Sequence, residues 1–250
     1  MQSTDMTFDF RGRTLVLTGA NGGIGQAIAT MFYEAGCNLV LSDLDQDGLE
    51  TFTNKFSDRD RIAWLKADAS SATDAETTVK LASSRFGGID FLVPSAVIYL
   101  SRPFSEMSDQ DWLRTTSINL DGVFYLCRRA LGAMKDHSSI VTIASLAAYR
   151  GAFSNAHYGA TKGAMVSFTR ALSRELAPRT RVNGVAPGII ETPMVAQLMK
   201  TRGADTLAQT PLGRLGNASE IASVIAFLCS SAASFVTGET IQVNGGIYMA

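Results

Sequence analysis

Cysteine and histidine are scarce in this sequence, and neither is arranged as a metal site or a disulfide framework. The three cysteines, Cys37, Cys127 and Cys229, are far apart, and each lies in a largely apolar segment. Because their number is odd and their spacing fits no metal site, we expect reduced thiols in the protein core. The two histidines, His137 and His157, have no cysteine or carboxylate at ligand spacing, so we predict no metal.

Long runs of one charge and long apolar runs are also lacking. Basic and acidic residues nearly balance, 22 against 23, and no stripe of positive charge is present that would follow nucleic-acid phosphates. No apolar stretch reaches the length of about eighteen residues that a membrane span needs, and residues 1–10 show no apolar segment of a secretion signal. We therefore expect a cytoplasmic protein with neither a nucleic-acid nor a membrane partner.

What the sequence does contain is enough apolar material for one large core, since 46% of its 250 residues are hydrophobic. Short runs rich in β-branched residues alternate with longer helical patterns, which predicts an α/β fold with a doubly wound parallel sheet covered by helices on both faces. The expected strands are residues 14–18, 38–42, 62–67, 91–93, 139–144, 181–185 and 240–243.

Two of the expected helices are residues 25–35 and residues 108–135, the second beginning with a capping box between Ser108 and Asp111. No repeat and no long linker divides the chain, so we predict one domain over residues 1–250. The one long irregular stretch, residues 187–211, contains a short Met/Leu helical pattern. Such a stretch is usually either a functional lid or a disordered excursion, and we assign a substrate lid to about residues 189–212.

A glycine-rich segment, residues 18–25, follows the first expected strand and leads directly into a helix. Glycines there permit a tight turn and let backbone N–H groups approach a pyrophosphate at the positive end of the helix. A glycine cluster alone is a weak signal, and the alternative is a turn that binds nothing. The strand–turn–helix context in the first unit of the chain favours dinucleotide binding.

Two aspartates follow the next two strands. Asp43 closes the second strand, where a carboxylate can hydrogen-bond both ribose hydroxyls of the adenosine half and repel a 2′-phosphate. No lysine or arginine occupies residues 20–24 or 42–46, so NAD should be preferred over NADP. Asp68 follows the third strand and can accept a hydrogen bond from the adenine amino group. Either aspartate can instead be an ordinary turn residue.

Tyr158 and Lys162 lie four residues apart in a helical pattern and therefore share one helix face. An ammonium beside a phenol favours the phenolate, and with a nicotinamide cation it would make Tyr158 a general acid/base near neutral pH. Ser145 ends a strand at the edge where open α/β sheets bind ligands. Asn119 is a poor helix former inside the long helix, which suggests a local distortion or a buried polar role. Taken singly, Ser145 can be a turn residue, and Asn119 can face water.

Together these residues make the chain resemble the short-chain dehydrogenase/reductase family over essentially its whole length. The residues and motifs that carry the resemblance are residues 18–25, Asp68, Asn119, Ser145, Tyr158 with Lys162, Pro187 and Gly188 with Thr192, and residues 238–246.

The resemblance implies a Rossmann-like sheet of about seven strands and a catalytic tetrad of Asn119, Ser145, Tyr158 and Lys162. In such a tetrad Tyr158 exchanges the proton with the substrate oxygen, and Ser145 polarises that oxygen. Lys162 also holds the nicotinamide ribose, and Asn119 positions a water that relays protons from Lys162.

The expected cofactor is therefore NAD. The residues that we expect to contact it are Gly19, Asn21, Gly22, Gly23, Ile24, Gly25, Asp43, Leu44, Asp68, Ala69, Ser95, Ala96, Tyr158, Lys162, Pro187, Gly188, Ile190 and Thr192. By the resemblance, Ile190 and Thr192 contact the carboxamide and fix which face of the ring delivers hydride.

The sequence departs from the family pattern after the fourth strand, where Asn-Asn-Ala-Gly is usual and this chain has Pro94, Ser95, Ala96 and Val97. Proline removes a backbone donor, and valine adds a branched side chain where glycine allows close approach. This departure puts the support of the central strand and the ribose contact in question, though not the tetrad.

The sequence therefore predicts an NAD(H)-dependent oxidoreductase that interconverts a secondary alcohol and a ketone of small-molecule size. One alternative is a 3-oxoacyl-[acyl-carrier-protein] reductase. Chains that resemble this one often have that activity, but it generally uses NADPH, and Asp43 argues against it. Another is a binding or scaffold protein without turnover, against which the intact tetrad argues. A partly apolar substrate pocket is suggested by Tyr99, Phe153, Met194, Leu198 and Met199.

The resemblance also implies a homo-oligomer, most simply a homotetramer, in which residues 109–135 and 155–176 pair across a two-fold axis. Small and apolar residues that would otherwise face water in the second of these helices are Ala156, Ala160, Ala164, Phe168 and Ala171.

Overall fold

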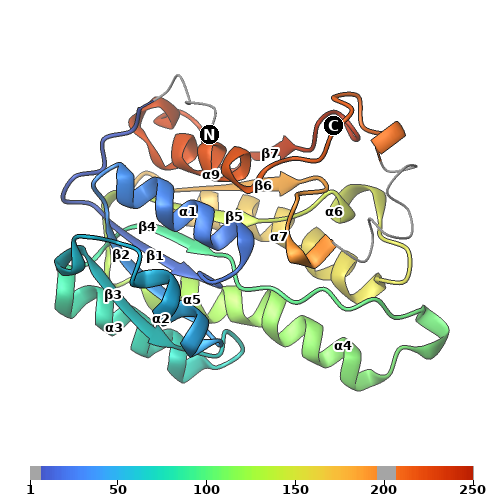
Figure 1. Cartoon of the computed structure of the whole chain (residues 1–250), viewed down its shortest axis with the longest axis horizontal. Helices are drawn as coiled ribbons and strands as arrows, with labels where there is room; N and C mark the ends of the chain where they lie inside the picture. The colour runs from blue at the N-terminus through green and yellow to red at the C-terminus, as the bar shows by residue number, and fades with distance from the viewer. Residues whose placement is uncertain (1–6, 196–206, 250) are drawn as a thin grey trace.

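The sheet of this protein consists of seven parallel strands in the order β3-β2-β1-β4-β5-β6-β7 (Figure 1). The structure is a computed structural model and describes residues 7–195 and 207–249. The strands are β1 (Thr14–Thr18), β2 (Asn38–Asp43), β3 (Ile62–Lys66), β4 (Ile89–Pro94), β5 (Met134–Ile143), β6 (Thr180–Pro187) and β7 (Thr240–Val243). The predicted doubly wound, Rossmann-like sheet is confirmed.

Helices cover both faces of this sheet. The α-helices are α1 (Gly23–Glu34), α2 (Gln46–Thr53), α3 (Ala72–Phe86), α4 (Asp109–Thr116), α5 (Gly122–Ala130), α6 (Ala147–Arg150), α7 (Ala156–Leu176) and α9 (Ala218–Cys229). In the described part of the chain, the short turns are the 3₁₀ segments η1 (Arg59–Arg61), η2 (Phe104–Glu106), η4 (Pro193–Val195) and η5 (Ser231–Ala233) and the π-helical turn η3 (Ser117–Asp121).

The strands are apolar throughout because each face of the sheet has its own core. Within β1, Leu15 and Leu17 point to the face covered by α1 and α9, whereas Val16 points to the face covered by α3, α5 and α7. Figure 1 shows the sheet running between these two helical layers. Since all strands are parallel, their carboxyl ends meet at one edge, and the strand order reverses between β1 and β4.

The helix predicted over residues 108–135 is wrong in its extent. It begins as expected, with Ser108 and Asp111 in a reciprocal capping box, but the α-helical part ends at Ala130 and β5 starts at Met134. The apolar residues after Ala130 continue the helical pattern in the sequence. Pairing of Met134 with Ile89 of β4 draws this segment into the sheet instead.

Asn119 is the reason to expect a distortion inside this helix, and the distortion is present. Residues 117–121 form the π-helical turn η3, and Asn119 is only 1% exposed. Its side-chain oxygen accepts a hydrogen bond from the Ile98 amide at 2.9 Å, and its side-chain nitrogen donates to the Ile98 carbonyl at 3.0 Å. Asn119 therefore ties this helix to the segment after β4, as a buried polar residue must.

All three cysteines are free and buried, as predicted. Burial raises the pKa of the Cys127 and Cys229 thiols to about 12, and it raises that of Cys37 as well. Within residues 7–195 and 207–249, no group of three or more His, Cys, Asp or Glu is placed to hold a metal ion. None of the helices in that part of the chain has the length and apolarity of a membrane span.

The lid predicted at about residues 189–212 is described only at its two ends. Its first residues lead into η4, and Ile190 is buried, with 4% of its surface exposed. The Met/Leu helix expected within it, with Leu198 and Met199, lies outside the described residues, as does the side chain of Met194.

Candidate active site

A cleft of about 1100 Å³ lies at the carboxyl edge of the sheet, where the strand order reverses. This is the place where open α/β sheets bind their ligands. Every residue that the sequence predicts to contact the cofactor lines this one cleft, from Gly19 to Thr192. Of the predicted tetrad, Ser145, Tyr158 and Lys162 line it as well, whereas Asn119 is not among the lining residues.

The glycine-rich turn after β1 is held by contacts that leave no room for a side chain. Gly19 has a positive φ of +65°, and a Cβ there would lie 2.7 Å from the Ala96 Cα. A Cβ on Gly25 would lie 2.2 Å from the carbonyl oxygen of Gly19. Both contacts are with backbone, which cannot move aside, so glycine is required at both positions.

Helix α1 begins at this turn without a side-chain cap. Gly22 is its N-cap residue, and the first turn holds no acidic side chain. By contrast, α3 and α4 are capped by the Ser71 and Ser108 hydroxyls. The uncapped end of α1 lines the cleft at Gly22, Gly23 and Ile24. Free amides at the positive end of a helix fit an anion such as the pyrophosphate of a dinucleotide.

Asp43 sits at the end of β2 with its carboxylate fixed at the edge of the cleft. One oxygen accepts a hydrogen bond from the Asn21 amide at 2.9 Å, and the other accepts from the Asp45 amide at 3.0 Å. Leu44 beside it is 61% exposed. The lysine and arginine among the described lining residues are Lys162 and Arg150, which belong to α7 and α6. The described lining residues therefore place no cation beside Asp43, and Lys66, its partner in the register of β2 and β3, does not line the cleft.

Asp68 lines the cleft next to Ala69, and one of its oxygens has a local structural role. That oxygen accepts hydrogen bonds from the Ser70 amide at 2.8 Å and the Ser70 hydroxyl at 2.7 Å. The other oxygen makes no hydrogen bond within the described residues. The turn role is thus established in the structure, and the adenine contact stays a prediction.

The segment after β6 closes the cleft opposite the loop after β4. A Cβ on Gly188 would lie 2.7 Å from the Asn244 Cα, and the methyl group of Thr192 lies 2.8 Å from the place a Cβ of Gly23 would take. Thr192 is therefore packed against the start of α1. The lining residues from this segment are Pro187, Gly188, Ile189, Ile190, Thr192, Pro193 and Val195.

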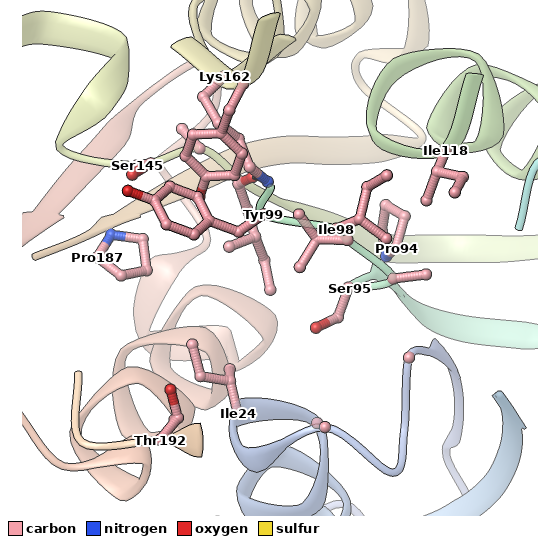
Figure 2. Close-up of a pocket in the computed structure, with 18 of the residues that line it drawn as sticks. Ile24, Pro94, Ser95, Ile98, Tyr99, Ile118, Ser145, Lys162, Pro187 and Thr192 are labelled. Atoms are coloured by element: carbon pink, nitrogen blue, oxygen red, sulfur yellow. Dashed lines mark hydrogen bonds between the residues drawn. The ribbon is translucent and has the colours of Figure 1, made fainter. Parts of the chain in front are cut away.

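Three tetrad residues come together where β5 meets α7. The Lys162 ammonium donates to the Ile143 carbonyl at 2.7 Å and lies 5.7 Å from the centre of the Tyr158 ring. The Ser145 side chain lies close enough to Tyr158 to lower the pKa of the phenol, and its hydroxyl accepts a hydrogen bond from the Ala147 amide at 3.1 Å. Figure 2 shows Ser145 and Lys162 on one side of the cavity, with Ile24 and Thr192 across it.

Asn119 stands apart from these three residues. Both polar atoms of its side chain are engaged with the Ile98 backbone, as described above. In the described structure its side chain anchors the segment after β4. A role in positioning a water remains a prediction.

Burial dominates the ionisation of the two central groups. It raises the pKa of Tyr158 to about 12, against a smaller lowering by the Ser145 hydrogen bond. It lowers the pKa of Lys162 to about 8. The Lys162 ammonium is anchored by its hydrogen bond to the Ile143 carbonyl. In the chain alone, Tyr158 is therefore a protonated donor at neutral pH, and stabilisation of the phenolate by Lys162 together with a nicotinamide cation stays a prediction.

The unusual segment after β4 is accommodated without breaking the sheet. Pro94 is the last residue of β4 and pairs with Thr18, while the pairing of β4 with β5 already ends at Leu92. The missing amide of proline thus costs no bond to β5. The Thr18 hydroxyl accepts hydrogen bonds from the amides of Ser95 and Ala96, both at 3.2 Å.

Val97 lines the cleft with an unstrained backbone, since the positive-φ non-glycine residues in the described chain are His137 and Ser154. Figure 2 shows Pro94, Ser95 and Ile98 along the side of the cavity that faces Ile118.

The substrate end of the cleft contains residues that the sequence reasoning did not single out. They are Ile98, Ile118, Arg150 and Ile247. The Arg150 guanidinium donates to the Ile247 carbonyl and to the Gln209 side chain, both at 3.2 Å. The three isoleucines are each adjacent in sequence to a motif residue, namely Val97, Asn119 and Gly246, and could have been found from that proximity. Nothing in the sequence marks Arg150, because α6 is only four residues long.

Comparison with known proteins places this site in a family. A protein-family model described as enoyl-(acyl carrier protein) reductase matches residues 19–248. The 3-oxoacyl-[acyl-carrier-protein] reductase FabG of Escherichia coli is 36% identical over 244 residues, which are 96% of this chain and 99% of that protein. The chain belongs to the short-chain dehydrogenase/reductase family. It is therefore an oxidoreductase with a nucleotide-binding Rossmann-like fold.

Solved structures of short-chain dehydrogenases/reductases superpose on the whole chain. A crystal structure from Brucella melitensis, titled short-chain dehydrogenase/reductase SDR:glucose/ribitol dehydrogenase, has a TM-score of 0.97 and 74% identity, covering 98% of this chain and 100% of that one. A 3-ketoacyl-(acyl-carrier-protein) reductase from Brucella melitensis complexed with NADH has a TM-score of 0.88 and 31% identity, covering 96% of this chain and 100% of that one.

Proposed function

We propose that this protein is an NADH-dependent reductase of 3-oxoacyl thioesters, a particular case of the interconversion of a ketone and a secondary alcohol. The observation that carries the chemistry is the convergence of Ser145 and Tyr158 with buried Lys162 in one cleft, the Lys162 ammonium lying 5.7 Å from the centre of the Tyr158 ring. The substrate class is supported by relatives of this length that are named 3-oxoacyl-[acyl-carrier-protein] reductases, at 36% identity in the Escherichia coli protein.

A nicotinamide dinucleotide, when bound, supplies the hydride. The chain's own residues handle the substrate oxygen. Tyr158, protonated at neutral pH because burial raises its pKa to about 12, donates a proton to that oxygen. The Ser145 hydroxyl donates a hydrogen bond to the same oxygen, which lowers the cost of the charge that develops on it. Lys162 keeps a positive charge close to Tyr158 and is anchored by the Ile143 carbonyl.

The proposed preference for NAD(H) rests on Asp43. Its carboxylate is held at the edge of the cleft by the Asn21 and Asp45 amides. There it can accept hydrogen bonds from ribose hydroxyls, and it would repel a 2′-phosphate. This preference separates the proposal from the usual NADPH dependence of 3-oxoacyl reductases, and a solved relative of that name in complex with NADH is compatible with it.

A second candidate is an NAD-dependent dehydrogenase of a sugar alcohol or another small secondary alcohol. The observation in its favour is the structure at 74% identity whose title contains glucose/ribitol dehydrogenase. Both candidates use the same Ser145, Tyr158 and Lys162 chemistry. They differ in the substrate that the outer part of the cleft accepts.

The deciding experiment compares kcat/KM for acetoacetyl-coenzyme A with NADH and with NADPH, and for ribitol and glucose with NAD⁺. Each assay is repeated with Tyr158→Phe. Efficient NADH oxidation by the thioester that disappears in the variant supports the proposal, whereas efficient oxidation of the polyol or sugar favours the second candidate. A preference for NADPH would contradict the role given to Asp43. Activity that is the same in Tyr158→Phe would contradict the catalytic assignment.

We further propose that the chain assembles into a homotetramer through α4, α5 and α7. Large apolar side chains are exposed on the first two of these helices: Trp112 at 40%, Leu113 at 62% and Phe124 at 49%. Ala156, Ala160 and Ala171 are exposed on α7, as an interface between helices would require. Light scattering tests this, and the mass of a monomer at micromolar concentration would refute it.

A further inference from the structure

Tyr99 lies directly against the catalytic tyrosine but has no role in the tetrad. It follows β4, lines the cleft and packs edge-to-face on Tyr158, with ring centres 4.9 Å apart and an interplanar angle of 89°. Figure 2 shows Tyr99 on the same side of the cavity as Ser145 and Lys162. Two phenol side chains therefore enter one cavity, and only one of them is needed to move a proton.

The hydrogen bonds around Tyr99 determine what its hydroxyl can do. Asn155 is buried at 1% exposure, and its side-chain nitrogen donates to the Phe153 carbonyl at 3.0 Å and contacts the Tyr99 oxygen at 3.2 Å. A carbonyl can only accept, so the amide group must be oriented with its nitrogen on this side. Both protons of the Asn155 nitrogen are then used, and the Tyr99 oxygen is the acceptor in its pair.

The Tyr99 proton is consequently uncommitted. Among the residues that the structure describes, the hydrogen-bond partner of the Tyr99 hydroxyl is Asn155, which donates to the Tyr99 oxygen, and none of these residues accepts the Tyr99 proton. Burial raises the pKa of Tyr99, so the group stays a neutral donor. A half-buried donor in a cleft gains a partner when a ligand carrying an acceptor atom binds.

We propose that Tyr99 is a specificity-determining residue whose hydroxyl donates a hydrogen bond to a second acceptor oxygen of the substrate, beside the carbonyl that Tyr158 and Ser145 address. This inference rests on the proposed function and names the feature of the substrate that the cleft selects. In a 3-oxoacyl thioester the second oxygen is the thioester carbonyl, two carbons from the reacting ketone. A hydroxyl next to a ketone offers the same acceptor chemistry one carbon away.

The test replaces Tyr99 by Phe, which keeps the ring packed on Tyr158 and removes only the hydroxyl. Tyr149→Phe is the matched control, because it also removes a phenol hydroxyl, while Tyr149 stacks on Tyr248 and is not among the cleft-lining residues. Three substrates are compared with NADH: acetoacetyl-coenzyme A, the hydroxyketone 3-hydroxy-2-butanone, and the simple ketone 2-butanone.

We expect Tyr99→Phe to lower kcat/KM about tenfold or more for the substrate whose second oxygen fits, as loss of a neutral hydrogen bond does. The simple ketone should change less than about threefold, the KM for NADH should stay constant, and Tyr149→Phe should match the wild type. An equal loss for all three substrates would mean that Tyr99 only supports the ring of Tyr158, and it would overturn the proposal, as would no loss at all.

The outcomes also separate this proposal from the proposed function. Turnover of the hydroxyketone without the thioester would refute the thioester reductase, while the Tyr99→Phe comparison would still be made on the hydroxyketone. Calorimetric titration of the NAD⁺-saturated protein with acetoacetyl-coenzyme A and with the hydroxyketone gives a readout independent of turnover. About tenfold weaker binding of one of them to Tyr99→Phe is expected. Failure of both to bind the wild type, or equal binding to the variant, would overturn the subsite.

Discussion

The two ends of the cleft are built in different ways. At the adenosine end, the shape is set by backbone: Gly19 and Gly25 leave no room for a Cβ, and α1 presents an uncapped amino terminus. At the substrate end, the lining consists of side chains such as Tyr99 and Arg150, carried by a loop and a helix of only four residues. This backbone cradle, the glycine-rich turn at residues 18–25 with the start of α1, tolerates few substitutions. The ligand of the adenosine end can therefore be inferred from the sequence. A wall of loop side chains can change freely, so its ligand cannot.

The largest effect is expected where the two ends meet, at Tyr158. Replacing it by Phe removes the proton donor but keeps the ring, so kcat should fall by about 10³-fold or more. Fluorescence titration with NADH should show a far smaller change in binding than in kcat, because Tyr158 supplies one of many predicted cofactor contacts and the glycine-rich turn stays intact. If NADH affinity fell as much as kcat, Tyr158 would contribute to cofactor binding as strongly as to proton transfer.

The cradle itself can be broken with one methyl group. Gly19→Ala would place a Cβ 2.7 Å from the Ala96 Cα, and Gly12→Ala is the matched control, since Gly12 also has a positive φ but nothing within 4 Å. Both variants carry the strain of a positive φ, about 1 kcal/mol. We expect only Gly19→Ala to lose in addition about 2 kcal/mol or more of unfolding free energy in urea, together with NADH binding. Equal behaviour of the two variants would show that the close approach is not required.

Lys162 lies between the two ends of the cleft, and the burial of its charge can be tested through the pH dependence of stability. Burial lowers its pKa from the ordinary 10.5 to about 8, so between these values the unfolded chain binds the proton more strongly than the folded one. The buried ammonium therefore lowers the free energy of unfolding by its full amount below pH 8, and this loss of stability disappears as the pH rises toward 10.5. A shift of this size corresponds to about 3 kcal/mol.

Lys162→Met removes this penalty and also the bond to the Ile143 carbonyl. We expect the variant to be more stable than the wild type at pH 7, by up to about 3 kcal/mol, with the difference shrinking between pH 8 and pH 10. Urea unfolding of both proteins across this range measures it, and the other ionisable groups cancel in the difference. A difference that grows with pH would show that the ammonium is not penalised by burial.

Asp43 should give the smallest of these effects, and one confined to the adenosine end. Asp43→Asn keeps an acceptor for the Asn21 amide but removes the charge that opposes a 2′-phosphate. We expect the ratio of kcat/KM for NADPH to that for NADH to rise about tenfold, with no change in the KM of the carbonyl substrate. Asp47→Asn removes an equal charge from the first turn of α2, outside the cleft-lining residues, and should leave the ratio unchanged.

Local chemistry made much of this fold predictable. The glycine turn, the Ser108 capping box, the buried cysteines and the strand pattern all follow from interactions between residues close in sequence or from simple burial. Most of the predicted cofactor contacts follow a strand directly, and they line one cleft because the carboxyl ends of the parallel strands lie at one edge of the sheet. Whether they bind the cofactor as predicted is a matter for the experiments above.

Features that depend on distant partners were not predictable. The helix expected over residues 108–135 stops at Ala130 because Met134 pairs with Ile89, which is far away in the sequence. The partner of Asn119 is the backbone of Ile98, which no spacing rule indicates. The ionisation of Tyr158 is governed by burial, whereas the sequence displays only its neighbour Lys162. The free proton of Tyr99 becomes visible only once Asn155 is placed beside it.

The π-helical turn at residues 117–121 makes the number of residues in this part of the chain matter. Each residue of an α-helix turns about 100°, so removing one from this turn would rotate the whole of α5 by that amount. Its buried residues Val123, Leu126 and Cys127 would then leave the sheet, although every amino acid in α5 would be unchanged. Substitutions are thus better tolerated here than insertions or deletions. Homologous proteins should keep the length of this segment even where its amino acids differ.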